Sequence, residues 1–456
     1  MIADLKPYPA YKNSDVPWLG EVPGHWDTRP LKRWVRMNAE VLPETTAPDY
    51  EFCYRDIGSV GMRILTQKPQ RLRFATAPSR ARRVVHKGDT IVSTVRTYLK
   101  AIYFADREPD EFVCSTGFAV LTPRVGTLPK FVSYLAQSNP FTDRVTSYSV
   151  GIAYPAIAET RLGSFHVAVP PLTEQAAIVR FLDHADRRIR RYIRAKQKLI
   201  KLLEEQKQAI IHHAVTRGLD PNVHFKPSGV EWLGNVPQHW EVKRLKWVTR
   251  LQRGYDLPAD RRISGPFPVV SSGGIIDSHC EARSRGPGVV MGRYGSTDAV
   301  FFLDTDFWPH NTALFVTDFH GNRPRWCYFM LRTISKADHA GKSAVPGVDR
   351  KDLFEIVVAT PPVSEQDGIV AWIETVSANL DRAIAAAQRE INLLREYRTR
   401  LIADVVTGKL DVREAAARLP DEAEEPESLD EADALSDVEE DADDDLAAEL
   451  AEAHTE

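Results

Sequence analysis

Two groups of side chains in this sequence combine positive charge, aromatic rings and hydroxyl groups at loop positions. The first group comprises Arg96, Tyr98, Lys100, Ser115, Thr116 and Tyr154, and the second comprises Arg293, Tyr294, Ser296, Asn311, Thr312 and Lys342. Arginine can donate two hydrogen bonds to guanine, asparagine can pair in the same way with adenine, and hydroxyls and tyrosine hold phosphates or base edges. The two groups predict two surfaces that bind nucleic acid, although an ordinary polar turn is an equal alternative for any single residue.

Patterns of catalytic and metal chemistry are missing from the sequence. Gly341–Ser343 suggests a phosphate-binding loop, but Lys336 stands where the first glycine of that motif belongs. His212 and His213 are adjacent, so they do not share one face of a helix, and the four cysteines form no CxxC pair. No Asn-Pro-Pro-aromatic motif for amino-methylation of a base is present. We therefore expect a non-catalytic chain that binds no metal and no cofactor of its own.

Short apolar strands carry these loops. Strand-like runs broken by Gly, Pro and Asp lie at residues 82–95, 101–106 and 118–123, and again in the same order at residues 288–293, 299–304 and 313–318. The two surrounding regions, Met37–Val169 and Thr249–Ala359, are predicted to be divergent copies of one mixed α+β fold. Loops on such a scaffold commonly carry binding residues.

Two further repeats frame these variable regions. Residues 14–32 and 228–246 are identical at 11 of 19 positions, at an offset of 214. Residues 170–179 and 361–370 also repeat, at an offset of 191, as do 215–220 and 406–411. Each unit thus has a constant start, a variable middle and an end of fixed length. The four tryptophans of the first repeat, Trp18, Trp26, Trp232 and Trp240, are expected to be buried where a helix end meets the next domain.

A long segment without glycine or proline follows the first variable region, at Glu174–Ala214, and its copy has the same length. Positions alternately four and three residues apart are mostly apolar in both copies, which is the pattern of a coiled coil. They are Ile178, Leu182, Ala185, Ile189, Tyr192, Lys196, Leu199, Leu203, Gln206 and Ile210, and then Ile369, Ile373, Val376, Leu380, Ala383, Ala387, Glu390, Leu394, Tyr397 and Leu401.

Two such helices, each about 60 Å long, have one apolar seam apiece. The simplest partner for one seam is the other helix. A pseudo-twofold axis would then make the helices antiparallel and would place one variable domain at each end. The alternative is that each helix packs separately on its own domain.

The net charge of −4 hides a strong asymmetry. Residues 421–456 contain 18 Asp and Glu and no Lys or Arg, so the remaining residues carry 59 basic against 45 acidic side chains, a net charge of +14. Such a body attracts polyanions. The acidic tail is expected to be disordered, and we hypothesise that it competes with DNA for the basic surface. The sequence contains no apolar run long enough to span a membrane, and a cytoplasmic protein is expected.

In combination, these features resemble the specificity subunits of type I restriction–modification systems. The resemblance rests on the doubled WLG-x-VP-x-HW, PP-x₂-EQ-x₂-IV and VT-x₂-LD motifs in one order, and it covers about residues 11–418. It implies two target recognition domains, at 11–169 and 221–360, each reading one half of a bipartite double-stranded DNA target. The long helices, at 170–220 and 361–411, would form an antiparallel coiled coil between them, and 419–456 would be a disordered acidic tail.

The resemblance also implies partners. Two methyltransferase subunits, which bring S-adenosylmethionine, would dock on the conserved helices, and restriction subunits, which use ATP and Mg²⁺, would complete the enzyme. Two alternatives are a stand-alone DNA-binding protein, whose tail blocks the methyltransferase, and an enzyme such as a nuclease hidden in one variable domain. Co-purification with a methyltransferase subunit and magnesium-dependent DNA cleavage by the isolated chain would distinguish them.

Overall fold

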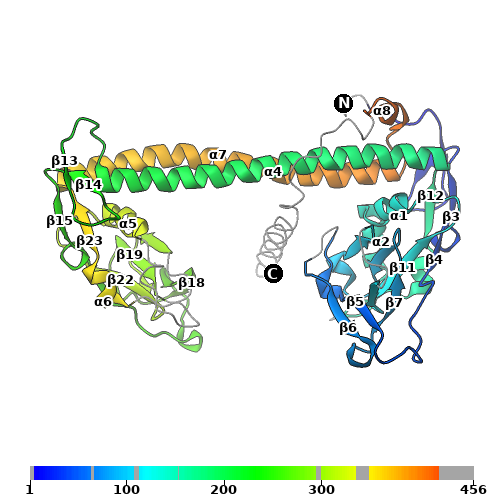
Figure 1. Cartoon of the computed structure of the whole chain (residues 1–456), viewed down its shortest axis with the longest axis horizontal. Helices are drawn as coiled ribbons and strands as arrows, with labels where there is room; N and C mark the ends of the chain where they lie inside the picture. The colour runs from blue at the N-terminus through cyan, green and yellow to red at the C-terminus, as the bar shows by residue number, and fades with distance from the viewer. Residues whose placement is uncertain are drawn as a thin grey trace. The chain divides into compact units, whose positions relative to one another are not determined.

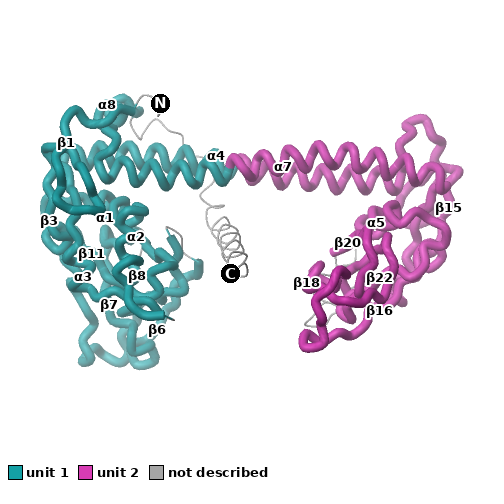
Figure 2. The backbone as a smooth tube through the Cα atoms, turned by 180° about the vertical axis from the view of Figure 1, so that it is seen from behind, with its two compact units in different colours: residues 1–194, 391–456 teal, residues 195–390 magenta. Residues whose placement is uncertain are grey.

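The chain forms two compact units, one of residues 1–194 with 391–456 and the other of residues 195–390 (Figure 2). The computed structural model describes residues 5–62, 66–106, 112–152, 154–293, 299–334 and 349–420. The boundary between the units falls inside two long helices, α4 (Leu172–Arg217) and α7 (Val363–Val406), so each unit holds one half of each helix. The predicted acidic tail lies outside the described residues from position 421 onward.

In the described residues of the first unit, the three short helices α1 to α3 accompany two four-stranded sheets, and a fourth, α8 (Arg413–Ala417), follows α7 (Figure 1). One sheet has the order β4-β11-β8-β9 and is antiparallel, with strands Val35–Met37, Phe118–Pro123, Thr90–Ser93 and Ile102–Phe104. The other has the order β6-β5-β10-β7, with strands Gln70–Arg73, Glu51–Arg55, Phe112–Ser115 and Ala81–Val85, of which β5 and β10 are parallel. The helices are α1 (Pro129–Ala136), α2 (Asn139–Ser147) and α3 (Glu159–Gly163), and two strand pairs, β1 (Tyr11–Asn13) with β2 (Glu21–Pro23) and β3 (Asp27–Pro30) with β12 (His166–Val169), complete the unit.

The second unit repeats the first of these sheets. Its order is β16-β22-β19-β20, antiparallel, with strands Arg250–Arg253, Ala313–Asp318, Gly288–Gly292 and Val300–Leu303. A three-stranded sheet has the order β18-β17-β21, with strands Gly274–His279, Phe267–Ser271 and Trp308–Pro309. The pairs β13 (Phe225–Pro227) with β14 (Asn235–Pro237) and β15 (Glu241–Arg244) with β23 (Val357–Thr360), and the helices α5 (Pro324–Thr333) and α6 (Arg350–Glu355), complete the unit.

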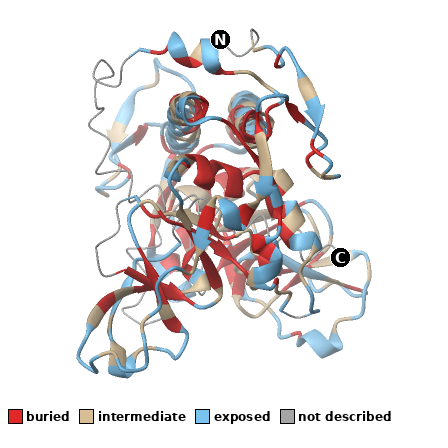
Figure 3. Cartoon of the chain, turned by 90° about the vertical axis from the view of Figure 1, so that its right-hand side faces the viewer, coloured by how far each residue is buried: buried red, intermediate tan, exposed pale blue. Residues whose placement is uncertain are grey.

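The predicted recurrence of strands is therefore confirmed. The runs at 90–93, 102–104 and 118–123 form β8, β9 and β11, and their counterparts form β19, β20 and β22 in the same spatial order. Most residues of β8, β11, β19 and β22 are buried, and Figure 3 shows buried residues concentrated within the sheets, which explains why the hydrophobic runs were recognisable. The α+β class of both units is correct.

The repeated Glu-Gln pair at the start of each long helix ties that helix to its own domain. Gln175 is fully buried; its side-chain oxygen accepts from Leu128 N at 2.7 Å, and its amide donates to Gly126 O and Pro170 O. Gln366, its copy, is also fully buried and makes the matching bond to Arg323 N at 2.9 Å. Each glutamine thus accepts a hydrogen bond from the backbone N–H directly before α1 or α5. These bonds fix the direction in which the long helix leaves the domain.

The long helices pair with each other and run antiparallel within each unit (Figure 1). In the first unit, Asp186 of α4 bonds Arg398 of α7 at 2.5 Å. In the second unit, Lys196 pairs with Glu390 at 2.7 Å and Lys207 with Asp381 at 2.5 Å. As residue numbers rise in α4 they fall in α7. The coiled-coil prediction is confirmed, and the alternative of two separately packed helices is excluded for the described residues.

The register of the seam departs from the prediction in the middle of each helix. In α4, Ile178, Leu182 and Ile189 are buried as expected, but Tyr192 and Leu199 are 54% and 41% exposed, so their assignment to the seam was wrong. The next residue along turns inward instead: Ile193 is 7% exposed and Ile200 is half-buried. Leu203 is half-buried, as predicted. Leu182 to Ile193 is one eleven-residue step, which a helix of about 3.6 residues per turn follows better than a strict heptad.

The second helix behaves in the same way. Of the five leucines and isoleucines assigned to its seam, Ile369, Ile373 and Leu401 are buried, and Leu380 and Leu394 are half-buried. Glu390 is exposed, whereas Ile391 beside it is 1% exposed. The sequence could have indicated this change of register, because an apolar residue stands next to a polar residue at the predicted seam position.

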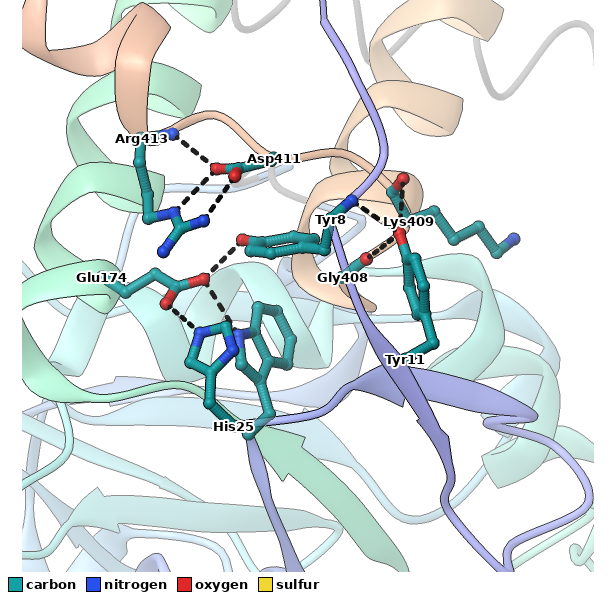
Figure 4. Close-up of polar contacts among 9 residues, drawn as sticks. Tyr8, Tyr11, His25, Glu174, Gly408, Lys409, Asp411 and Arg413 are labelled. Atoms are coloured by element: carbon teal, nitrogen blue, oxygen red, sulfur yellow. Dashed lines mark hydrogen bonds and ion pairs between the residues drawn. The ribbon is translucent and has the colours of Figure 1, made fainter.

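Each tryptophan cassette forms a joint with the first turn of a long helix. In the first unit, Glu174 accepts hydrogen bonds from Trp26 Nε1 at 2.9 Å and from Tyr8 Oη at 2.5 Å, and His25 Nε2 lies 2.7 Å from its other oxygen (Figure 4). Gly408, just after α7, lies against the same cassette, because a Cβ atom there would come within 2.4 Å of Pro23. The joint thus gathers the cassette, the start of α4 and the end of α7.

The prediction that four tryptophans are buried in these joints is half correct. Trp26 and Trp240 are 0% and 1% exposed and occupy equivalent places in the two units. Trp18 is half-buried at the edge of the core, and Trp232 is 37% exposed. In each cassette, the second tryptophan is buried at the centre of the joint, and the first lies nearer the surface.

Candidate nucleic-acid interface

The first loop group gathers around a short turn between β8 and β9, Thr97–Leu99, which is flanked by two residues in the left-handed conformation. Arg96 has φ 51° and Lys100 has φ 48°. The backbone N–H of Arg96 donates to Pro155 O at 2.8 Å, and Thr97 Oγ1 lies 2.7 Å from Ser149 Oγ. These bonds hold the turn against the segment before α3, so residues more than 50 positions apart share one surface.

The aromatic and basic side chains of this surface are organised around one stack. The guanidinium of Arg96 lies 4.8 Å from the centroid of the Tyr154 ring, and Tyr98 and Tyr154 are 54% and 63% exposed. Stacking leaves the N–H edge of a guanidinium free to reach a base edge or a phosphate. Lys100 Nζ bonds Asp143 Oδ1 at 3.0 Å, so this charge is partly balanced within the protein.

Ser115 and Thr116 fall in different environments. Ser115 ends β10 at 1% exposure, and its hydroxyl accepts from Gly117 N at 3.3 Å. A side chain so deeply buried does not reach DNA in this conformation, and we remove it from the candidate set. Thr116 is exposed beside it, and its N–H donates to Arg80 O at 2.8 Å. All four residues of β10 are buried, and the first exposed residue, Thr116, follows the end of the strand.

In the second unit, predicted and unpredicted residues line one open pocket of about 680 Å³. Arg293 and Asn311, both predicted, share it with the segment at the end of β16 and with the start of α6. Its lining residues are Gln252, Arg253, Gly254, Tyr255, Asp256, Arg293, Asn311, Leu314, Asp349 and Arg350. The pocket therefore presents both positive and negative groups and side-chain amides, which are the groups that distinguish base edges.

Asn311 is held in place within this pocket. Its side-chain amide donates to Asp256 Oδ1, and its backbone carbonyl accepts from Arg253 Nε at 3.3 Å. Gly254 makes the close approach possible, because a Cβ atom there would lie 2.1 Å from His310 O. With one amide hydrogen committed to Asp256, the oxygen and the second hydrogen of Asn311 are set in a defined orientation.

Of the remaining predicted residues of the second group, the structure describes only Thr312. Thr312 is half-buried, and its hydroxyl lies 3.1 Å from His310 Nδ1. Burial, followed by the nearby positive charge of Arg262, lowers the pKa of His310. Tyr294, Ser296 and Lys342 lie outside the described residues.

The chain is similar to known DNA specificity proteins. Residues 78–202 match the family model of the type I restriction modification DNA specificity domain. The MjaIX specificity subunit of Methanocaldococcus jannaschii is 20% identical over 54% of this chain, and the EcoKI specificity subunit of Escherichia coli is 22% identical over 66% of it. A chain from a structure that describes complex assembly and conformational transition of the type I R-M system has the same fold, with a TM-score of 0.68 and 21% identity, over 85% of this chain and 99% of that one.

Residues 78–202 are therefore similar to the DNA specificity domain of type I restriction–modification systems, and the chain has the fold of a solved chain from such a system. The chain spans 56% of the length of the MjaIX subunit and 70% of the EcoKI subunit. The matched region begins just before β7 and ends within α4, so it includes the Arg96 turn, the Tyr154 segment and the first joint glutamate.

Sequence reasoning missed the segment 252–256. Gln252, Arg253 and Tyr255 combine amide, basic and aromatic groups around a glycine directly after the first strand of the sheet, and that composition was the available signal.

In the described part of the chain, no three His, Cys, Asp or Glu side chains are grouped to hold a metal ion, and no helix is long and apolar enough to cross a membrane.

Proposed function

We propose that this chain is the DNA-recognition subunit of a cytoplasmic type I restriction–modification complex, in which each unit reads one half of a bipartite double-stranded DNA target. The observation that carries the proposal is the same four-stranded sheet, built twice next to joints that share their Trp–Glu hydrogen bond, with chemically different loops. A repeated frame with unlike loops fits two different half-sites.

The first half-site would meet Arg96, Tyr98, Lys100, Thr116 and Tyr154. The stack of Arg96 on Tyr154 supports this assignment, since it fixes a guanidinium at an exposed surface. Bidentate contacts of arginine to guanine are the commonest base-specific contacts in protein–DNA interfaces. Tyr98 and Lys100 are better suited to backbone phosphates, which position the protein without specifying the sequence.

The second half-site would meet the pocket of the second unit, through Arg293, Asn311, Thr312 and the newly found Gln252, Tyr255 and Asp256. Tyr294, Ser296 and Lys342 stay predictions from the sequence. Asn311 is suited to adenine, and the carboxylate of Asp256 is suited to the amino group of cytosine. Because the two units offer different groups, they should select different half-sites.

The paired helices would fix the separation of the half-sites and dock two methyltransferase subunits. Their equal predicted lengths and the ion pairs between them support a spacer role. The transferred methyl group would come from S-adenosylmethionine bound by the methyltransferase subunits, and ATP and Mg²⁺ would serve the restriction subunits. The chain itself would be non-catalytic.

The proposal is tested by expressing the chain with and without a partner methyltransferase and mapping modified bases across the host genome. A single bipartite motif that appears only with both proteins is expected. A contiguous motif, or methylation that is independent of the chain, would contradict it. Exchanging the first variable region, residues 37–169, for that of a relative should change one half of the motif and leave the other half intact.

A further inference from the structure

A stripe of arginines lies along one face of α4 within the first unit. Arg180, Arg187, Arg191 and Arg194 follow one another at seven, four and three residues, so at about 100° per residue they project within about 40° of one direction. Arg187, Arg191 and Arg194 are exposed, and Arg180 is half-buried. These four residues are called the arginine stripe.

The arginine stripe of α4 is not repeated in α7. The equivalent positions of α7, at the offset of 191, are Ala371, Ala378, Arg382 and Ala385. A role that both helices share, such as pairing with each other, therefore does not explain the stripe. Its purpose must be specific to the first unit, and three exposed arginines along one helix face are a site for a polyanion.

The acidic tail leaves the folded chain at one end of this stripe. After α8 (Arg413–Ala417), Leu419 is 7% exposed, and Arg180 Nη2 donates to Leu419 O at 2.8 Å and to Pro420 O at 3.1 Å. The next 36 residues carry 18 carboxylates. Covalent geometry lets 36 residues reach at most about 120 Å, whereas the stripe is about 21 Å long, so the tail is long enough to follow it.

We propose that residues 421–456 bind along the arginine stripe of α4. Leu419 and Pro420, directly before the tail, are held at Arg180, so the local concentration of carboxylates near Arg187, Arg191 and Arg194 is high. Each exposed ion pair is weak, but many carboxylates compete for each arginine, and the sum is sensitive to salt. The occupied stripe is withheld from DNA phosphates, which restricts the basic body of the protein to its reading surfaces.

Zero-length cross-linking tests this contact directly. Arg191→Lys places an amine within the stripe of the full-length chain, and a carbodiimide joins it to any carboxylate in contact. Peptide mass spectrometry should find position 191 joined to the tail at least about tenfold more often than position 36 in the matched variant Arg36→Lys, which is also exposed in this unit. The yield should fall when salt is raised to about 0.5 M. Equal yields at both positions, or none at 191, would overturn the proposal.

A second measurement identifies any other occupant. In a chain that ends at Pro420, Arg187→Glu, Arg191→Glu and Arg194→Glu should not weaken binding to the cognate duplex, whereas the truncation itself should raise affinity for a mixed-sequence duplex at low salt by about tenfold. A large loss of cognate binding in the triple variant, together with no tail cross-link, would make the stripe a DNA site and would refute the tail as its occupant. The cross-link does not depend on DNA, so its outcome is separate from that of the proposed function.

Discussion

In the first unit, Trp26 donates to the glutamate in the first turn of α4 at 2.9 Å; in the second, Trp240 donates to the equivalent glutamate of α7 at 3.1 Å. Lys12 and Lys226 likewise donate to the carbonyl oxygens of these tryptophans, at 2.6 and 2.7 Å. The same side chains make the same bonds, although the cassettes are 214 residues apart in the chain. The joints have kept their chemistry because each fixes where a rigid helix begins.

The reading loops show the opposite behaviour. One is built around Arg96 stacked on Tyr154, and the other around Asn311 bonded to Asp256. Arg96 follows β8, whereas Asn311 precedes β22, so the two loops lie at different strands of the shared sheet order. The comparison teaches that the two units share the geometry of their joints and helices and differ in the chemistry of their loops.

The largest effect is expected from changing the length of one long helix while both loops stay unchanged. Inserting four residues after Lys198 lengthens α4 by about 6 Å and leaves both reading loops untouched. The original target should be lost, with affinity falling toward the non-specific level, about 10³-fold or more. Methylation mapping should recover the same two half-sites with a different number of base pairs between them.

A matched insertion after Arg389, the equivalent position of α7, provides the control. Two insertions restore equal helix lengths and should give a better-defined new spacing than either insertion alone. If the single insertion leaves the original spacing intact, the helices do not determine the separation of the half-sites.

Removing the centre of a joint should have the next largest effect. Trp26→Ala and Trp240→Ala each delete a side chain that is at most 1% exposed, which costs about 3–5 kcal/mol of stability. The loss should be similar in both units, because the two joints share their bonds. Urea unfolding measures the loss in the free energy of unfolding, and hydrogen exchange of the amides in each unit assigns the loss to that unit. Trp232→Ala, at a 37% exposed position, is the matched control and should cost about 1 kcal/mol or less.

The frame was predictable because it repeats. Two copies of each motif revealed the joints and the equal helix lengths, and strand periodicity revealed the sheet. The register of the coiled coil was not predictable in full: a 3.5-residue count selected Tyr192 and Leu199, while the helix buried Ile193 and turned Ile200 inward. A fixed heptad accumulates an angular error over a long straight helix, and tertiary packing decides where the extra residue is taken up.

The reading surfaces were predictable only in outline. Arg96 and Tyr154 were assigned to one surface, and the structure brings them into contact. Ser115 was assigned by its position in a polar turn, but β10 extends through Ser115 and all four of its residues are buried. Asp256 was missed because its importance arises from Asn311, 55 residues away in the chain. Pairings of this kind follow from topology rather than local sequence.

Loop substitutions should have smaller effects, confined to one half-site each. Arg96→Ala should weaken discrimination at one position of the first half-site by about 1–3 kcal/mol, and Asn311→Ala should do the same in the second. Binding to a panel of duplexes, each with one base pair changed, measures both. An equal loss on every duplex would make the residue a phosphate contact, and a change in both half-sites would contradict independent reading by the two units.

The smallest effect concerns one of the bonds in which the joints differ. Tyr8 donates to Glu174 in the first unit, whereas its equivalent at the offset of 214 is Asn222, which is exposed. Tyr8→Phe should cost about 1.5 kcal/mol, because Glu174 keeps its bonds to Trp26 and His25. Asn222→Ala, the control, should cost about 0.5 kcal/mol or less.

The difference between wild type and Tyr8→Phe should also depend on pH in one direction. Burial, and then the bond to Glu174, raise the pKa of Tyr8 above its ordinary value of 10.0. The folded tyrosine therefore stays protonated while the unfolded one ionises, so the stability it confers is constant below pH 10 and decreases above it. Unfolding of both proteins between pH 7 and about 11 measures this difference. A difference that increases above pH 10 would mean that Tyr8 ionises more readily when folded, and would remove it as the donor that distinguishes the first joint from the second.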